Sequence, residues 1–204
     1  MSRSKRDFVQ FLVDSGALKF GDFVLKSGDR SPFFINLGNV DTGKKLHLLG
    51  EFLADAMEQY FPDADTLFGP AYKGISMATA AAAEMARRGR DSGVFHDRKE
   101  AKDHGEGGNF IGVAPTAQSR IVIIDDVMSS GGTKLQAIEA IEKVFHVRPV
   151  GVLVTVDRTR KDADIDKKAM NLKAIITLKD IADFLQDKGD ERYITVLKFY
   201  GEEV

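Results

Sequence analysis

The sequence contains no cysteine and only 5 prolines among its 204 residues. Without cysteine the chain has no disulfide bond, no thiolate nucleophile and no cysteine-ligated zinc or iron–sulfur centre. Any metal ion would be bound by carboxylates, carbonyls or the 4 histidines. This set of ligands favours a hard ion such as magnesium.

A large excess of either charge is also missing. The chain has 29 Lys and Arg against 31 Asp and Glu, a net charge of -2, so it offers no overall basic field for nucleic acid or membrane lipids. No stretch approaches the roughly 18 apolar residues of a membrane span. The apolar run 8–13 is interrupted by Gln10 and ended by Asp14, which predicts a short amphipathic helix rather than a targeting signal. We expect a cytoplasmic protein that binds neither nucleic acid nor membranes.

The length and a composition of 43% hydrophobic and 29% charged residues predict one globular domain over residues 1–204. Residues 1–40, here called the hood, contain short β-type runs separated by glycine and proline. Apolar residues at helical spacing over 46–60 predict an amphipathic helix. The C-terminal segment 187–204 is predicted to be a docking helix or strand, without an assigned function.

The middle of the chain alternates short apolar strands with helices. This pattern is typical of βαβ units and predicts an α/β fold with a central, mainly parallel sheet flanked by helices. In such sheets ligands bind beyond the carboxyl ends of the strands. The predicted strands are 66–68, 93–95, 121–124 and 150–156, and the predicted helices are 75–88 and 133–145.

The segment 121–141, IVIIDDVMSSGGTKLQAIEAI, carries the strongest functional signal. The small residues 129–133 allow backbone N–H groups to approach a phosphate closely at the start of a helix. Asp125 and Asp126 repel phosphate and suit vicinal sugar hydroxyls, directly or through magnesium. We therefore expect this loop to bind a sugar phosphate, although a polar turn that caps a helix is the simpler alternative.

Three other segments carry candidate cations. The stretch 98–112 concentrates four of them next to glycines, which suits a mobile lid over a diphosphate, and a solvated charged loop is the alternative. Lys73 follows the strand 66–68 and should lie on the same rim of the sheet as Asp125, and an exposed turn lysine is the alternative. Arg158 follows the strand 150–156, where it can bind a planar carboxylate or form a surface salt bridge.

Two common nucleotide motifs are absent. The chain has no G-x-x-x-x-G-K-[ST] sequence, and Phe110 occupies the third glycine position of the only G-x-G that approaches a dinucleotide fingerprint. A P-loop nucleotidase and a dehydrogenase-like nucleotide-binding protein are therefore disfavoured.

The motif IVIIDDVMSSGGT at 121–133 resembles the phosphoribosyl-diphosphate motif of the type I phosphoribosyltransferases. FGPAYKG at 68–74 and RKEAKDHGEGGN at 98–109 are similar to the orotate-specific branch of that family, and LKSGDRSPFFIN at 25–36 and TLKDIADFL at 177–185 extend the resemblance over nearly the whole chain. The resemblance implies a type I phosphoribosyltransferase fold with the hood and a mobile catalytic loop. It also implies a pentosyltransferase that joins orotate to phosphoribosyl diphosphate with magnesium, and a homodimer whose lid reaches into the neighbouring subunit's site.

The resemblance also assigns residues, which fall into a donor set and an acceptor set. The residues expected to bind phosphoribosyl diphosphate are Lys26, Tyr72, Lys73, Arg98, Lys99, Lys102, His104, Asp125, Asp126, Val127, Met128, Ser129, Ser130, Gly131, Gly132 and Thr133. Those expected to bind orotate are Lys26, Phe34, Ile35, Ser129 and Arg158. The catalytic set comprises Lys73, Arg98, Lys99, Lys102, His104, Asp125 and Asp126. No residue is assigned as a direct metal ligand, because magnesium is expected on the diphosphate and ribose, with a water-mediated contact to Asp125 left open.

Two positions depart from the family pattern. Gly132 stands where a hydroxyl residue is common, so Thr133 or Ser130 would have to replace that phosphate donor. Ile35 stands where an aromatic residue is frequent, which leaves open how much stacking the acceptor base receives. Two other functions remain open: a transferase for a different base, and a regulatory protein that binds phosphoribosyl diphosphate without turning it over.

Overall fold

The computed structural model describes residues 4–24, 30–98 and 109–202. Four predicted site residues, Lys26, Lys99, Lys102 and His104, lie outside these ranges. In chain order the elements are α1 Lys5–Asp14, β1 Leu18–Val24, β2 Arg30–Ile35, the 3-10 helix η1 Leu37–Asn39, α2 Gly43–Tyr60, β3 Thr66–Phe68, α3 Lys73–Arg87, β4 Gly93–Asp97, β5 Phe110–Gly112, β6 Ile121–Met128, α4 Gly132–Phe145, β7 Gly151–Asp157, β8 Leu172–Thr177, α5 Leu178–Asp187 and α6 Arg192–Tyr200. None of the helices in the described ranges is long and apolar enough to cross a membrane.

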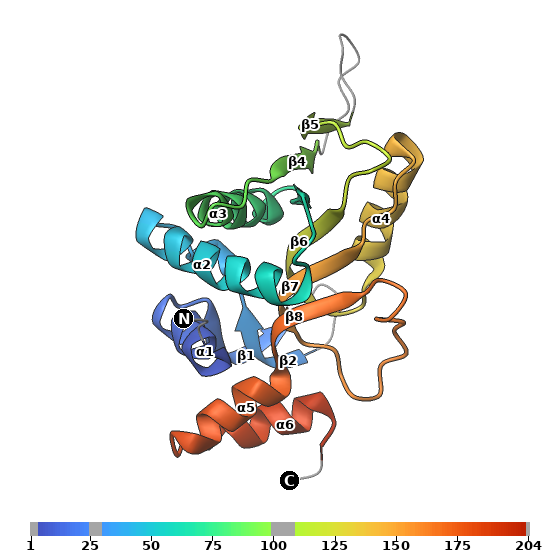
Figure 1. Cartoon of the computed structure of the whole chain (residues 1–204). Coiled ribbons are helices and arrows are strands. Elements are labelled where there is room, and N and C mark those ends of the chain that lie inside the picture. Colours follow the sequence, from blue (N-terminus) through green and yellow to red (C-terminus); the bar gives the residue numbers. More distant parts are fainter. Residues whose placement is uncertain (1–3, 25–29, 99–108, 203–204) are drawn as a thin grey trace.

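The core of the fold is a six-stranded sheet in the order β5-β4-β3-β6-β7-β8. All neighbouring pairs are parallel except β4 and β5, which are antiparallel. Helices α2 and α3 cover one face and α4 covers the other (Figure 1). The predicted α/β fold with a mainly parallel sheet flanked by helices is therefore confirmed.

Burial on both faces explains why β6 reads as a continuous apolar run. Val122 and Ile124 belong to the hydrophobic cluster that contains residues of α2 and α3, whereas Ile121 and Ile123 belong to the cluster that contains Ile138 of α4. Successive side chains of a strand point to opposite faces, so a strand buried on both sides has no polar alternation.

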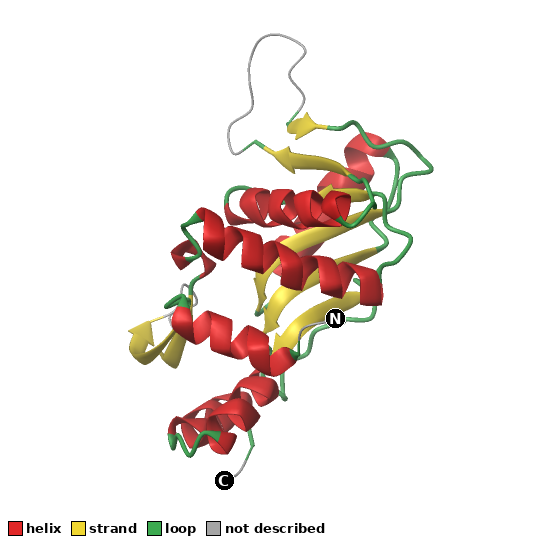
Figure 2. Cartoon of the chain, turned by 60° about the vertical axis from the view of Figure 1, so that its left-hand side comes forward, coloured by secondary structure: helices red, strands yellow, loops and turns green. Residues whose placement is uncertain are grey.

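The hood contains a hairpin that lies outside the main sheet. Strands β1 and β2 form their own two-stranded antiparallel sheet, in which Leu18 pairs with Ile35. The parallel strands of the main sheet point toward the side of the molecule where this hairpin and helices α5 and α6 lie (Figure 2). The carboxyl ends of the strands thus face the hood.

Several boundaries differ from those the sequence predicts. The strand predicted to end at Ile124 continues to Met128, because Val127 and Met128 still pair with Val156 and Asp157 of β7. Asp125 and Asp126 therefore lie within the strand rather than in a turn after it. The predicted helix 75–88 begins two residues earlier, at Lys73. The C-terminal segment is a helix, α6, and strand β8 was not predicted.

Helix starts fall into two groups. Helices α1, α2 and α5 begin with side-chain caps from Ser4, Thr42 and Thr177. Helices α3, α4 and α6 have no side-chain cap, and of these α3 and α4 begin beside the end of β6. A capped helix has already satisfied one of its first N–H groups, whereas an uncapped one leaves them available to solvent or a ligand.

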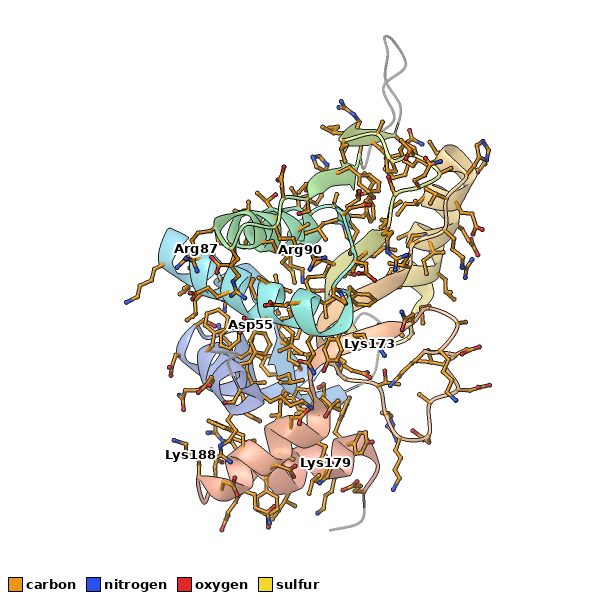
Figure 3. The ribbon with its side chains drawn as sticks, viewed as in Figure 1. Asp55, Arg87, Arg90, Lys173, Lys179 and Lys188 are labelled. Carbon is orange, nitrogen blue, oxygen red and sulfur yellow. The ribbon has the colours of Figure 1, made fainter. Side chains whose placement is uncertain are left out.

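A cluster of charged side chains joins α2 to α3. Glu84 is buried and accepts hydrogen bonds of 2.7 Å from two nitrogens of Arg87 and from one nitrogen of Arg88. Arg88 also donates to Asp55 of α2 at 2.6 Å. Figure 3 labels Asp55 and Arg87, on the two neighbouring helices. The hydrogen bonds from Arg87, and then those from Arg88, lower the pKa of Glu84 to about 2 against the opposing effect of burial.

Replacing this carboxylate should destabilise the protein in a pH-dependent way. We expect Glu84→Gln to lower the free energy of unfolding at pH 7 by about 1.5–3 kcal/mol, the usual cost of losing hydrogen bonds to a charged group. The folded-state pKa is depressed, so the stabilisation is present above the unfolded pKa and is lost as pH falls toward 2. The difference between variant and wild type should therefore shrink between pH 5 and pH 3, as measured by urea unfolding. Glu139→Gln, at an exposed position of α4, is the matched control, and a difference that stays constant with pH would contradict this account.

Candidate functional site

Asp125 lies at the carboxyl half of β6 and forms an ion pair with a lysine from the next helix. The Nζ of Lys134 is 2.6 Å from one carboxylate oxygen of Asp125 and donates a 2.7 Å hydrogen bond to the carbonyl of Val127. The other oxygen of Asp125 accepts from the backbone N–H of Asp126 at 2.8 Å. Lys134 is itself buried, with 6% of its surface exposed. It therefore fixes both the side chain and the backbone of the strand end.

Asp126 forms an ion pair with Lys73, the first residue of α3. The second oxygen of Asp126 accepts from the N–H of Val127, and the Thr155 hydroxyl donates to the Asp126 carbonyl. The prediction that Lys73 shares a rim of the sheet with the two acids is confirmed. Each carboxylate oxygen of the acidic pair thus has one donor.

The electrostatic balance at the pair is set by burial. Burial raises the pKa of Asp125, and the adjacent Asp126 charge acts in the same direction, whereas the Lys134 ammonium opposes both. An opposite charge at hydrogen-bond distance favours the ionised form of a carboxyl group. Lys134 is therefore the residue that keeps a negative charge at the end of a buried strand.

The loop after the acids has the geometry of an anion cradle. Gly131 has a φ of +81°, the left-handed conformation that glycine adopts without strain, and it is the N-cap of α4. Within the described ranges, the backbone N–H groups of residues 129–133 donate to no acceptor. Successive N–H groups at a helix start favour a bound anion. Ser129, Ser130 and Thr133 are exposed beside them, so their hydroxyls are available to the same ligand.

Three residues of the segment predicted to bind phosphate, Val127, Met128 and Gly132, offer no side-chain donor to a ligand. Met128 is fully buried, and its carbonyl accepts a 3.0 Å hydrogen bond from the N–H of Arg158. The Val127 carbonyl is bonded to Lys134. A Cβ built on Gly132 would meet no atom within 4 Å, so the missing hydroxyl reflects the residue type and not a lack of space.

The segment 69–73 forms a second loop on the same side. A Cβ on Gly69 would lie 2.2 Å from the Gly74 carbonyl oxygen, so only glycine allows the loop to fold back so closely. The N–H of Ala71 donates to Asp97 at 2.6 Å, and Asp97 ends β4. Tyr72 is 73% exposed. Arg98 lies next to the 69–73 loop because it directly follows Asp97 in the chain. Its backbone N–H donates to the Asn109 carbonyl at 2.7 Å.

On the acceptor side, the structure brings Arg158 and Ser129 to neighbouring strand ends, because Met128 pairs with Asp157. Asp157 does not pair with Arg158: it accepts from Lys167 at 2.6 Å and from the hydroxyl of Thr159. The sequence alternative of a surface salt bridge at Arg158 finds no carboxylate partner within the described ranges. Burial lowers the pKa of Arg158 from its ordinary value.

The two hood residues predicted to meet the acceptor point in opposite directions. Phe34 is 37% exposed, whereas Ile35 is 6% exposed and belongs to the hydrophobic core. Alternation along β2 explains this, since neighbouring side chains leave opposite faces of a strand. The Ile35 side chain therefore packs in the core and Phe34 is the exposed aromatic residue of the pair, while the assignment of both to the acceptor stays a prediction.

Lys134 and Asp97 are site residues that the sequence reasoning missed. Leu135, Ile138 and Ile141 are apolar residues three apart, a spacing that indicates one buried face, but Leu135 is 43% exposed. The buried row is Lys134, Ile138 and Ile141, at spacings of four and three. A lysine in register with two buried isoleucines, close after two acids, is the signal that could have identified the ion pair.

Comparison with known proteins gives one consistent picture. Residues 40–189 match the model of the phosphoribosyl transferase domain. An orotate phosphoribosyltransferase of Salmonella arizonae is 38% identical over 100% of this chain and 99% of that protein. One of Xanthomonas axonopodis pv. citri is 46% identical over 83% of this chain and 76% of that protein.

Solved structures agree with these matches. The crystal structure of an orotate phosphoribosyltransferase of Francisella tularensis has a TM-score of 0.78 at 31% identity, covering 95% of this chain and 96% of that one. An adenine phosphoribosyltransferase of Leishmania donovani, with a TM-score of 0.52 at 15% identity over 85% of this chain and 80% of that one, shares the fold alone.

Removing the buried ammonium should cost stability. We expect Lys134→Met to lower the free energy of unfolding by about 3 kcal/mol, because a buried carboxylate is left without its counter-charge. Urea unfolding followed by circular dichroism measures this difference. Lys143→Met, at an exposed position of the same helix, should stay within about 0.5 kcal/mol of wild type. Equal effects of the two substitutions would contradict the role assigned to the ion pair.

Proposed function

The chain belongs to the phosphoribosyl transferase family, and on that premise we propose that it transfers the phosphoribosyl group of 5-phosphoribosyl 1-diphosphate to orotate. The products are orotidine 5′-monophosphate and diphosphate, a step of pyrimidine synthesis. The observation that carries this function is the meeting, at neighbouring strand ends, of an acidic pair, an anion cradle and an arginine that has no carboxylate partner among the residues the structure describes. One sugar phosphate bearing an acidic base would engage all three.

The donor is bound across the end of β6. Its 5′-phosphate lies in the 129–133 loop, where free N–H groups and hydroxyls supply the donors. Asp125 and Asp126 accept from the ribose hydroxyls, which orders the ring. Lys73, held at Asp126 by their ion pair, moves to the diphosphate when the donor arrives.

Orotate is bound on the hood side. Arg158 supplies a charge and paired N–H groups for the planar base or its carboxylate. Ser129 adds a hydroxyl from the neighbouring strand end, and Phe34 adds an exposed ring. Lys26 lies outside the described ranges, and its assignment to both substrates rests on the family resemblance.

Magnesium fits this site as a partner of the substrate. Within the described residues no group of three or more His, Asp or Glu side chains gathers to form a cage. Asp125 and Asp126 each already hold an ammonium group. Magnesium is commonly bound by one or two carboxylates together with substrate phosphates. The ion would be held by the diphosphate and ribose near this pair, and when bound it neutralises the charge of the leaving group.

The reaction requires no protein nucleophile. A ring nitrogen of orotate attacks the anomeric carbon while the bond to diphosphate breaks, so positive charge builds on the ribose and negative charge on the leaving group. The chain orders both substrates and places cations around the diphosphate. Lys73 and Arg98 are the cations of that set within the described ranges, and Tyr72, in the 69–73 loop, adds a neutral phenol hydroxyl.

The remaining donor residues are proposed from the sequence. Lys99, Lys102 and His104 would complete the charge on the diphosphate, and the segment that carries them would close over the reacting carbon and exclude water. We further propose that the enzyme is a cytoplasmic homodimer in which this segment serves the neighbouring subunit's site. Support for both comes from the family resemblance and from a composition typical of soluble enzymes.

The decisive assay follows the ultraviolet absorbance of orotate. Mixed with phosphoribosyl diphosphate and the purified protein, orotate should lose its absorbance in the presence of magnesium and keep it when the metal is removed by a chelator. Unchanged absorbance together with calorimetric binding of the donor would replace this function with transfer to another base or with a sensor of phosphoribosyl diphosphate.

A pair of variants tests the cationic segment and the dimer together. Lys102→Ala should lower turnover by about 10²–10³, the usual cost of losing one donor that stabilises developing charge. Asp126→Asn should also be nearly inactive, because it disturbs the binding of ribose. Mixing the two variants under conditions that exchange subunits should restore activity, since one site of each mixed dimer is then intact.

Two outcomes would contradict this proposal. Near-wild-type turnover of Lys102→Ala would remove the role given to that lysine. A mixture that stays inactive, although mixed dimers are detected by native mass spectrometry, would show that the segment serves its own subunit. Unmixed variants kept at the same concentrations are the control.

A further inference from the structure

Arg158 has an unusual environment for a charged side chain. It is half-buried, and within the described ranges its guanidinium group has neither a hydrogen-bond acceptor nor a carboxylate partner. Its central carbon lies 5.7 Å from the centre of the Phe33 ring and 5.4 Å from that of Phe199. Both distances are within the range of cation–π attraction. Two aromatic rings thus take the place of a counter-ion.

The two rings come from opposite ends of the chain. Phe33 lies in β2 of the hood and is 1% exposed, and Phe199 lies in the last turn of α6. The rings contact each other edge to face, with centres 5.0 Å apart and planes at 73°. Aromatic pairs prefer this arrangement, which also fixes the position of each ring.

Helix α6 is held at both of its ends by contacts with other parts of the chain. The Tyr200 carbonyl accepts a 2.9 Å hydrogen bond from the N–H of Lys161, in the loop that carries Arg158. At the other end of the helix, the Arg192 guanidinium lies 4.4 Å from the centre of the Phe20 ring in β1. Helix α6 therefore connects the hood to the end of β7, next to the acceptor side of the site (Figure 1).

We propose that Phe199 and Phe33 are positioning residues that orient the Arg158 guanidinium toward the carboxylate of the acceptor. The ring centres lie 5.7 and 5.4 Å from the central carbon of Arg158 and only 5.0 Å from each other, so both rings lie on one side of the guanidinium group. The N–H groups on its other side remain available to pair with a carboxylate. A half-buried charge without a counter-ion gains most from an anionic ligand. The C-terminal helix thereby determines specificity for an acidic base. This inference rests on the proposed function and adds a role for α6.

The test is the kinetics of Phe199→Leu. The variant removes one ring, so we expect the KM for orotate to rise about tenfold, while the KM for phosphoribosyl diphosphate stays within about twofold. The inhibition constant of uracil, which has no carboxylate, should be unchanged. Phe199→Tyr keeps the ring and should restore the KM for orotate. Phe199→Met, whose unbranched side chain adapts to irregular gaps, replaces the leucine variant if that one does not fold.

The matched control is Phe184→Leu. Phe184 lies in α5 and is 6% exposed, and it also stacks with cations, Arg6 and Lys188, but it has no contact with Arg158. It should lower thermal stability without changing the KM for orotate.

The inference would be overturned if Phe199→Leu left the KM for orotate within twofold of wild type, or raised the KM values of both substrates equally. A wild-type protein that does not consume orotate would instead overturn the proposed function. The two failures are therefore distinguishable.

Discussion

Two adjacent carboxylates at the end of a buried strand would be unstable without cations beside them, and the site depends on how that charge is balanced. Lys134 reaches Asp125 from α4, and Lys73 reaches Asp126 from the start of α3. Because α3 and α4 cover opposite faces of the sheet (Figure 1), these two ion pairs connect β6 to both helical layers. Lys134 is buried and also donates a hydrogen bond to the Val127 carbonyl. Lys73 is half exposed, so its ammonium group can leave Asp126 and bind a phosphate.

This asymmetry suggests a division between structure and chemistry. Lys134 favours the ionised form of Asp125 and fixes the strand end. In the proposed reaction, Lys73 moves from Asp126 to the diphosphate. The neighbouring loop has a glycine in the left-handed conformation and N–H groups that donate to no acceptor in the part of the chain that the structure describes. On the hood side a single arginine is held by aromatic rings rather than by an acid. The donor and acceptor sides therefore use opposite charge, which matches a sugar whose hydroxyls need acceptors and a base whose carboxylate needs a cation.

The sequence was sufficient to predict the α/β fold and most of the residues at the strand ends. Alternating strands and helices placed Lys73, Asp125 and Arg158 on one rim, because the carboxyl ends of parallel strands share an edge. Local pattern could not show that β6 continues through the acids, since that depends on pairing with β7. It also could not show which side of β2 faces the core, so Ile35 was assigned to the acceptor although it is buried.

Two of the contacts that sequence reasoning missed join distant segments. Asp97 is 26 residues from Ala71, whose N–H it accepts, and Phe199 meets Phe33 across almost the whole chain. Lys134 was missed because a charged residue was not expected on the buried face of a helix. Asp97, Lys134 and Phe199 each contact another residue of the site: the Ala71 N–H, the Asp125 carboxylate and the Arg158 guanidinium, respectively. None of the three belongs to the motifs on which the sequence reasoning relied.

The most direct test of the whole arrangement is a crystal structure with orotidine 5′-monophosphate bound. The account predicts the phosphate in the 129–133 loop, the ribose hydroxyls at Asp125 and Asp126, and the base carboxylate on the N–H groups of Arg158, with Phe33 and Phe199 still in contact with its guanidinium group. A nucleotide whose phosphate lies outside that loop, or whose base lies away from Arg158, would contradict it.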